Sequence, residues 1–371
     1  MVLIRQNCGP TNMADDLRNI FSQFETGQAF VSAEPFGEGH IHQTFRVKTA
    51  GDNPDFILQK INNFVFRDTD ILMENLGRIT SHLARKIPGT GTDWHILSFF
   101  PVRGGRLYYT DGNGAHWRLM NFIPHDTGEQ MRCNIHLSAG EAYARFISLL
   151  GDLPGPPLKE TIPDFHNLDK RLRYFREASG NAISERKKRA AGDILFAEER
   201  AVQMAYIPDV LAEGKIRLRP THNDTKLDNI LFSSSGVIRG VVDLDTVMPG
   251  LPHYDYGDAI RSFGNSCLED EKALERIELR MDVFESFSAG FISTISGELN
   301  DMEKQTLVYA PPMFAYMQGI RFLTDYLSGD PYYKTAWPEH NLVRARNQFA
   351  LLASMDNNFT RMREIIEKLL A

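Results

Sequence analysis

The chain has 371 residues, of which 42% are apolar and 24% are charged, and its 48 acidic against 41 basic side chains give a formal net charge of −7. This composition excludes a disordered or fibrous protein and fits a globular protein of two or three packing units. The acidic balance argues against a nucleic-acid partner, since binding to a phosphate backbone depends on a surplus of Lys and Arg.

Three cysteines, Cys8, Cys133 and Cys267, lie far apart and in no metal-ligand spacing. They predict free thiols in a reducing compartment rather than a disulfide framework. No apolar run reaches the length of a membrane span, and residues 1–16 contain no stretch of signal-peptide type. We therefore expect a cytoplasmic protein without a membrane partner.

The first third of the chain predicts a small antiparallel sheet. Residues 13–24 are typical of a short helix, and the alternation over 31–61 predicts three strands. Thr69 begins a helix with one apolar face, formed by Leu72, Leu76, Ile79 and Leu83. Further strands are predicted over 95–102, 105–110 and 116–123. Residues 1–123 are thus predicted to form a β-rich domain.

Beyond residue 123 the pattern becomes helical. Ser138 and Glu141 form a capping-box pattern that predicts the start of a helix ending near Leu150. Other helices are predicted over 164–178, 184–205 and most of 269–370. A short hairpin lies between them, with strands over 229–233 and 237–243. Residues 124–371 are thus predicted to form an α-rich domain, and the chain is of the α+β class.

The segment from Thr221 to Asn229, together with the strand that ends in Asp243, contains the groups that phosphoryl transfer requires. Asp224 can orient an acceptor hydroxyl and take its proton, and Lys226 can neutralise the transferred phosphoryl group. Asn229 and Asp243 offer the hard oxygen ligands that Mg²⁺ prefers. Positioning and charge neutralisation suffice for this reaction, so no covalent nucleophile is needed. Each residue alone is also typical of a polar surface loop, and the full spacing favours catalysis.

The spacing His-x-Asp-x-x-x-x-Asn over residues 222–229 resembles the catalytic loop of the kinase-like phosphotransferases, the superfamily of protein kinases, choline kinases and aminoglycoside phosphotransferases. The resemblance implies a bilobal protein-kinase-like fold with ATP and Mg²⁺ in its cleft. It implies Asp224 as the catalytic base, with Asn229 and Asp243 as metal ligands. Small-molecule kinases of this kind often have Gly where Asn223 stands, which implies that this loop is held differently.

Two further residues take structural roles in this resemblance. His222 is the first residue of the catalytic-loop pattern. Aminoglycoside-type kinases have an Asp after the metal aspartate that braces the catalytic loop. Asp255 is the candidate for that Asp, and Asp258 is the alternative.

The resemblance also implies a nucleotide site in the β-rich domain. Gly37 and Gly39 lie between two predicted strands, where glycines let backbone amides approach phosphates, and a plain hairpin turn is the alternative. His40 and His42 would face the nucleotide phosphates or the acceptor. Lys60 stands where the superfamily has the lysine that pairs with the phosphates.

The usual partner of that lysine is a glutamate on the following helix. Glu74 is the candidate, but helical geometry places it nearly opposite the apolar face, while Asn75 flanks that face. Either residue can be the partner of Lys60. Pairing of Glu74 with Arg78 on a solvated face is the alternative.

Candidates for contacts with adenine and with the acceptor come from other segments. Adenine would meet backbone groups of the strand 117–123, with Asn121 and Ile123 as candidates, although an ordinary buried strand is equally compatible. Acceptor contacts are predicted from Arg261, Asn265 and Arg321.

One predicted helix supports a sugar acceptor. Gln318, Arg321 and Asp325 share a face of it, and a neutral polyol needs hydrogen-bonding groups of this kind. A cationic aminoglycoside would instead need clustered carboxylates. A surface pair between Arg321 and Asp325 is the alternative.

Longer matches narrow the resemblance to the N-acetylhexosamine 1-kinases. The matching segments are Gly-His-Ile (39–41), Leu-Gln-Lys-Ile-Asn (58–62), His-Asn-Asp-Thr-Lys (222–226), Val-Asp-Leu-Asp-Thr-Val-Met-Pro-Gly (242–250), Tyr-Asp-Tyr-Gly-Asp (254–258), Arg-Phe-Leu-Thr-Asp-Tyr-Leu (321–327) and His-Asn-Leu (340–342). That family phosphorylates the anomeric hydroxyl of N-acetylglucosamine or N-acetylgalactosamine with ATP and Mg²⁺. Met317-Gln318 departs from a more polar pair in this family.

Several alternatives stay open at this point. A kinase of the same fold could act on an amino alcohol, homoserine, another sugar or an aminoglycoside. A nucleotide-binding pseudokinase is the alternative from a different class. The sequence predicts neither the oligomeric state, nor the sugar epimer, nor the role of Asp245.

Overall fold

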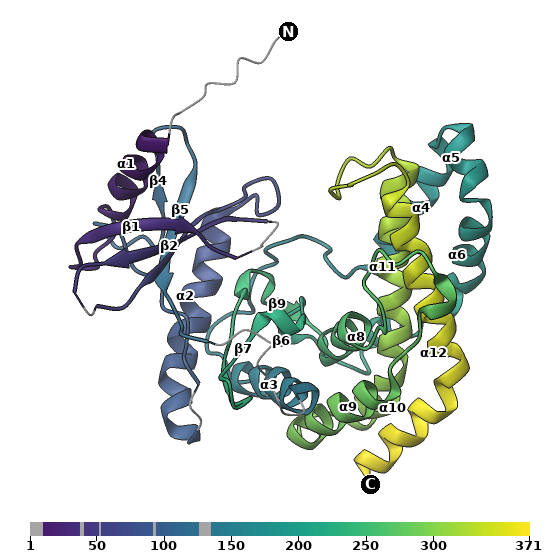
Figure 1. Ribbon diagram of the computed structural model, residues 1–371. Coiled ribbons are helices and arrows are strands. Elements are labelled where there is room, and N and C mark those ends of the chain that lie inside the picture. The colour runs from purple at the N-terminus through teal and green to yellow at the C-terminus, as the bar shows by residue number, and fades with distance from the viewer. Residues whose placement is uncertain (1–9, 38–40, 52, 92–93, 126–134) are drawn as a thin grey trace. The chain divides into compact units, whose positions relative to one another are not determined.

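The computed structural model describes residues 10–37, 41–51, 53–91, 94–125 and 135–371. The chain divides into two compact units. The first comprises the chain up to His125 together with Lys159–Ile162, and the second comprises Asp126–Leu158 and Pro163–Ala371. The chain therefore leaves the first unit, returns to it for four residues and leaves it again (Figure 1).

The first unit contains a five-stranded antiparallel sheet of order β1-β2-β3-β5-β4 (Figure 1). Its strands are β1 (Phe30–Pro35), β2 (Gln43–Thr49), β3 (Phe56–Lys60), β4 (Tyr109–Thr110) and β5 (His116–Asn121). Alternate residues of β2, β3 and β5 face one side and bury Val47, Leu58 and Leu119 against helix α1 (Pro10–Phe21). The predicted antiparallel sheet is confirmed.

Two of the predicted strands are wrong. Residues 95–102 form no strand, and 105–110 shortens to β4. The side chain of Asn121 accepts the N–H of Ser98 at 2.6 Å and donates to the carbonyl of Ile96 at 3.1 Å, so a side-chain amide holds this segment in place of a full ladder. Pro101 also removes a backbone donor that a strand would use.

Helix α2 (Thr69–Lys86) follows β3. It begins after Asp68, whose side chain accepts the N–H of Ile71 at 2.9 Å and satisfies one of the free donors of the first turn. The predicted apolar face is confirmed, because all four of its residues are buried: Leu72, Leu76, Ile79 and Leu83.

The second unit is built mainly from helices. They are α3 (Ile135–Leu150), α4 (Leu168–Asn181), α5 (Ser184–Arg189), α6 (Ala191–Met204), α7 (Tyr206–Ala212), α8 (Pro252–Phe263), α9 (Met281–Ile295), α10 (Asp301–Thr306), α11 (Ala310–Leu327) and α12 (His340–Leu370). Two short antiparallel pairs join them, β6 (Arg219–Thr221) with β9 (Met248–Gly250) and β7 (Ile230–Phe232) with β8 (Ile238–Val241). Among the described residues, no helix has both the length and the apolar character to cross a membrane.

Helices α3 and α9 approach closely through glycines. A Cβ atom on Gly140 would lie 2.2 Å from the carbonyl oxygen of Phe287, and one on Gly290 would lie 2.0 Å from that of Leu137. Any larger residue would push these backbones apart. On the same helix α3, the buried rings of Tyr143 and Phe146 contact the ring of His222.

Two predictions in the second unit are wrong. Helix α3 extends back to Ile135, so Ser138 lies inside it and does not cap its start. The helix predicted over 184–205 is interrupted at Ala190, which has φ −98° and ψ 10°. The prediction that 269–370 is mostly helical is confirmed, with α9 beginning at Met281.

Candidate active site

The segment between β6 and β7 forms a loop with an unusual backbone turn at Asn223. This residue has φ +64°, in the left-handed region where glycine is favoured and asparagine is tolerated. Its side-chain amide donates to the carbonyls of Thr221, Thr246 and Met248 at 3.0 to 3.3 Å. Asparagine thus provides the turn that a glycine would allow, and it adds three hydrogen bonds.

Asp255 on α8 holds this loop through hydrogen bonds to its backbone. Its carboxylate is buried and accepts the N–H of His222 at 2.8 Å and the N–H of Asn223 at 2.7 Å. The Thr225 hydroxyl donates to the backbone carbonyl of Asp255 at 2.8 Å. Burial raises the pKa of Asp255 to about 6, although His222 and the two backbone donors favour the ionised form.

Asp258 braces the same loop one turn further along α8. Its carboxylate accepts the N–H of Thr225 at 3.1 Å and forms an ion pair with Arg261 at 2.8 Å. Burial disfavours the charge of Asp258, but Arg261 outweighs it and the pKa is lowered. Arg261 also reaches Glu269 at 3.3 Å. Both aspartates that the sequence offered as alternatives therefore hold the loop, and the guanidinium of Arg261 is engaged in that brace.

His222 connects the loop to the segment that follows β8 and leads to Asp243. Its ring nitrogen Nε2 lies 2.9 Å from the carbonyl oxygen of Val242, and the hydroxyl of Thr246 donates to the His222 carbonyl at 2.7 Å. The residue is fully buried. These contacts give His222 a structural role between the two segments that carry the predicted chemistry.

Three of the predicted catalytic and metal-binding side chains lie together on this loop. The Lys226 ammonium lies 3.0 Å from one carboxylate oxygen of Asp224 and 3.1 Å from the other. Burial opposes the charge of Lys226, but Asp224 outweighs it, so the pKa of Lys226 is raised. The side-chain amide of Asn229 donates to the backbone carbonyl of Asp224 at 2.8 Å. The Asp224 side chain is only 17% exposed, against 49% for Lys226.

Asn229 and Asp243 have the chemistry of a magnesium site. Because the Asn229 amide nitrogen is held by Asp224, its oxygen is the group left for a cation. The N–H of Val242 donates to the Asn229 carbonyl at 2.9 Å, which brings the exposed Asp243 next to Asn229 at the open end of the β7–β8 hairpin. Mg²⁺ usually takes one or two carboxylates, with phosphates and waters as its other ligands. In the described ranges, no three His, Cys, Asp or Glu side chains form a preformed metal cage.

The first unit carries the residues predicted to bind nucleotide. Gly37 has φ +74° with open space around it, whereas Gly39 and His40 lie outside the described residues. Lys60 ends β3, and its ammonium lies 5.8 Å from the centroid of the Trp117 ring. His42 accepts the N–H of Asn62 at 3.2 Å, which gives its ring a structural contact.

Glu74 and Asn75 are engaged by the returning segment of chain. The Glu74 carboxylate pairs with the Lys159 ammonium at 2.7 Å, so the structure gives Glu74 a partner other than the predicted Lys60 or Arg78. Asn75 is buried and bonds to both backbone groups of Lys159, at 2.8 and 3.3 Å. Sequence reasoning missed Lys159, because no local pattern brings residue 159 back to this helix.

Asn121 and Ile123, the two residues predicted to contact adenine, have different hydrogen-bond partners. The side chain of Asn121 is occupied by residues 96 and 98, as described above, and its N–H donates to Ser98 at 3.2 Å. Ile123 is buried, and its carbonyl lies 2.9 Å from the ring nitrogen Nδ1 of His125. These contacts order the end of β5 and leave the adenine contacts as a prediction.

The structure does not form the surface pair between Arg321 and Asp325 that was the alternative to a shared acceptor-binding face. Arg321 on α11 donates to Gln318 at 3.2 Å and lies over the rings of Phe165 and Tyr333, at 5.5 and 6.0 Å from their centroids. Asp325 makes no pair with Arg321. It is buried, and its carboxylate accepts the backbone N–H groups of Tyr332 and Tyr333 at 2.9 Å each.

Asn265 also differs from its prediction as an acceptor contact. Its side-chain amide donates to Asn347 on α12 at 2.9 Å, and its oxygen accepts the N–H of Cys267 at 3.1 Å. We therefore assign Asn265 to the structure of the loop after α8.

Two residues near the catalytic loop were missed by sequence reasoning. The hydroxyl of Tyr143 on α3 donates to the Lys226 carbonyl at 2.5 Å. The ring of His166 lies with Nε2 at 2.9 Å from the Asn223 carbonyl oxygen. Neither belongs to a recognisable motif, and only the tertiary structure brings them to the loop.

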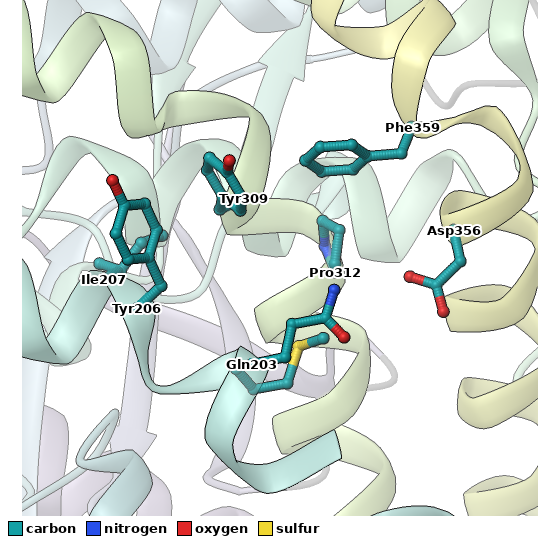
Figure 2. Close-up of a pocket in the computed structure, with 8 residues that line it drawn as sticks. Gln203, Tyr206, Ile207, Tyr309, Pro312, Asp356 and Phe359 are labelled. Carbon is teal, nitrogen blue, oxygen red and sulfur yellow. The ribbon is translucent and has the colours of Figure 1, made fainter. Parts of the chain in front are cut away.

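A small pocket lies elsewhere in the second unit, lined by residues of the helices α6, α7, α11 and α12 and by Tyr309 (Figure 2). The rings of Tyr206 and Tyr309 lie 4.8 Å apart, and those of Tyr309 and Phe359 lie 5.2 Å apart. Asp356 faces it and lies 3.4 Å from Arg200. None of its lining residues belongs to the loop from Thr221 to Asn229, so this pocket is separate from the predicted phosphoryl-transfer site.

Comparison with known protein families shows to which family the chain belongs. Residues 32–277 match the phosphotransferase enzyme family known as APH. This match covers well over half of the chain, so the protein belongs to that phosphotransferase family. The predicted superfamily is therefore confirmed, while the acceptor stays a prediction.

Solved structures share the fold at low sequence identity. An aminoglycoside phosphotransferase from Alicyclobacillus acidocaldarius subsp. acidocaldarius has a TM-score of 0.57 and 10% identity, over 94% of this chain and 96% of the other. Spectinomycin phosphotransferase, in complex with ADP and spectinomycin, has a TM-score of 0.58 and 12% identity, over 92% and 98%. A choline/ethanolamine kinase family protein from Mesorhizobium loti has a TM-score of 0.58 and 13% identity, over 95% and 99%. They confirm the predicted α+β, protein-kinase-like fold and nothing finer.

Proposed function

We propose that this chain is an ATP- and Mg²⁺-dependent kinase that phosphorylates the anomeric hydroxyl of an N-acetylhexosamine. The observation that carries the phosphoryl-transfer part is the braced loop, in which the side chains of Lys226 and Asn229 both bond to Asp224. ADP in the similar spectinomycin phosphotransferase supports a nucleotide as the phosphoryl donor.

The reaction is a direct in-line transfer. The acceptor oxygen forms a bond to the γ-phosphorus as the bond from that phosphorus to the β–γ bridging oxygen breaks, and ADP leaves with the electron pair. Asp224 orients the acceptor hydroxyl and takes its proton, and Lys226 neutralises charge on the transferred phosphoryl group. Mg²⁺, when bound by Asn229 and Asp243, supplies further charge neutralisation at the phosphates.

Two arginines, Arg171 on α4 and Arg321 on α11, favour a neutral or anionic acceptor. Each lies close enough to affect the other, and among the described side chains no carboxylate forms an ion pair with either of them. Burial, reinforced by the nearby charge of Arg321, lowers the pKa of Arg171 to about 10. Two neighbouring guanidinium groups would repel an aminoglycoside, choline or ethanolamine, whereas they can donate to the hydroxyl and carbonyl oxygens of an acetylated sugar.

The acceptor is tested by measuring ADP release with a panel of acceptors. We expect turnover with N-acetylglucosamine or N-acetylgalactosamine, and little with choline, ethanolamine, homoserine or an aminoglycoside. Phosphorus NMR of the product should show coupling of the phosphate to the anomeric proton. Turnover confined to a cationic acceptor would overturn the sugar assignment. No acceptor-dependent turnover at all would favour the pseudokinase alternative.

The chemical role of Asp224 is tested by Asp224→Asn. We expect kcat to fall by about 10² to 10⁴, the usual contribution of a general base. Asp228→Asn is the matched control, because Asp228 is exposed on the same loop and should keep near-wild-type activity. Equal activity of the two variants would contradict the assignment.

A further inference from the structure

His166 lies in the segment before α4 and contacts the catalytic loop directly. Its ring nitrogen Nε2 is 2.9 Å from the carbonyl oxygen of Asn223, the residue before Asp224. Aromatic rings surround it, with centroids at 4.4 Å for Phe165, 5.3 Å for Tyr254 and 4.9 Å for Phe314. The imidazole is therefore fixed in one orientation beside the residue that is to take the acceptor proton.

The contact with Asn223 determines which ring nitrogen carries hydrogen. A carbonyl oxygen only accepts hydrogen bonds, so Nε2 must be the N–H donor. The other nitrogen, Nδ1, then presents a lone pair, as long as the ring is neutral. Burial lowers the pKa of His166 to about 4, which keeps it neutral near pH 7.

The Nδ1 atom of His166 is buried and has no hydrogen-bond partner among the described residues. A buried acceptor without a donor costs free energy. Nδ1 of His222 and of His253 are in the same state, but those two residues are fully buried. His166 differs because part of the residue is exposed, although its Nδ1 atom is itself covered, so this unpartnered acceptor lies closer to the surface than those of the other two histidines.

The surroundings of His166 contain other polar groups suited to a hydroxylated ligand. Arg321 lies over the ring of Phe165, and Arg171 donates to the Phe165 carbonyl at 2.9 Å. Tyr333, which Arg321 also faces, has a buried hydroxyl beside the side chain of Gln318. We call His166, Arg171, Arg321 and Tyr333 the His166 cluster.

We propose that Nδ1 of His166 accepts a hydrogen bond from a hydroxyl or amide N–H of the phosphoryl acceptor and thereby determines acceptor specificity. The inference rests on the proposed function, since it assigns a recognition contact for the same reaction. Nε2 donates to the Asn223 carbonyl and holds the catalytic loop, while Nδ1 would accept a hydrogen bond from the acceptor. The same ring would therefore contact both the acceptor and the loop that carries Asp224.

The test is His166→Gln. The glutamine amide can keep the donor to the Asn223 carbonyl but places no acceptor at the position of Nδ1. The matched control is His253→Gln, which makes the same change at a histidine whose Nε2 also bonds to a backbone carbonyl, that of Glu303 at 3.2 Å. Each protein is assayed with the acceptor and with analogues that lack one hydroxyl or the amide N–H.

Wild type should discriminate against one analogue in kcat/KM by about tenfold or more, the value of one hydrogen bond. His166→Gln should lose that discrimination and keep the wild-type KM for ATP, while His253→Gln should keep the discrimination. Unchanged discrimination by His166→Gln would overturn the inference and leave the proposed function standing. If wild type turns over no member of the acceptor panel, the proposed function and this inference both fail.

Discussion

The catalytic loop and the His166 cluster differ in whether their buried polar groups have hydrogen-bond partners within the protein. In the loop, the side chains of Asn223 and Asp255 are bonded to several backbone groups of the protein itself. In the His166 cluster, Nδ1 of His166 is buried and lacks a partner among the residues that the structure describes. Satisfied groups fix a geometry, and unsatisfied groups are available to a ligand. On the proposal made above, the first kind of residue builds the site and the second kind recognises the acceptor.

Asp255→Ala should give the largest effect, because it removes the brace of the loop. The backbone N–H groups of His222 and Asn223 would lose their partner in a buried place, which costs about 3 kcal/mol of unfolding free energy. We expect urea denaturation to show this loss and kcat to fall with it. Asp282→Ala is the control, since that carboxylate is 71% exposed, and its cost should stay within about 0.5 kcal/mol. A stable, fully active Asp255→Ala variant would contradict the bracing role.

Arg321→Gln should affect recognition and leave stability nearly unchanged. Loss of a charge-assisted hydrogen bond costs about 1.5 to 3 kcal/mol, so kcat/KM for the acceptor should fall roughly tenfold to a hundredfold. The KM for ATP should not change. Arg173→Gln, at an exposed arginine over the Tyr174 ring, is the control. If both variants lowered the acceptor kcat/KM equally, the contrast between loop and cluster would be lost.

The pH dependence of stability should give the smallest effect. The pKa of Asp255 is raised to about 6 in the folded protein, whereas an unfolded aspartate titrates near 3.9. The unfolded chain therefore releases this proton first as the pH rises, and ionisation favours unfolding between these values. Relative to Asp255→Asn, the wild type should lose about 2 kcal/mol of unfolding free energy from about pH 4 to about pH 6. A difference that is constant with pH would show that Asp255 has an ordinary pKa.

The parts of the fold that depend on local pattern could be predicted from the sequence. The apolar face of α2 and the strands β1, β2 and β3 follow from side-chain periodicity, and the structure confirms them. The segment 95–102 could not be predicted, because its conformation depends on the side chain of Asn121. Its alternation resembles that of a strand, and only the tertiary contact decides otherwise.

The candidate site shows the same division between local and distant information. Residues 222–229 share one short segment, so their spacing could indicate a common site. The partner of Glu74 is 85 residues away and belongs to no motif, so helical geometry alone could not find it. Asp325 has the spacing of a helical pair with Arg321, yet two backbone N–H groups bind its carboxylate more completely than one guanidinium would. His166 offered no signal beyond its residue type.

The return of Lys159–Ile162 to the first unit has a consequence for synthesis of the chain. The buried amide of Asn75 meets its partner only after residue 159, although α2 itself ends at Lys86. On a ribosome, where domains generally fold as they emerge, the first unit must wait for the whole of α3 before it acquires its last segment. The sheet-containing unit is therefore not one continuous stretch of sequence, and a fragment ending at His125 would lack the residue that holds both Glu74 and Asn75.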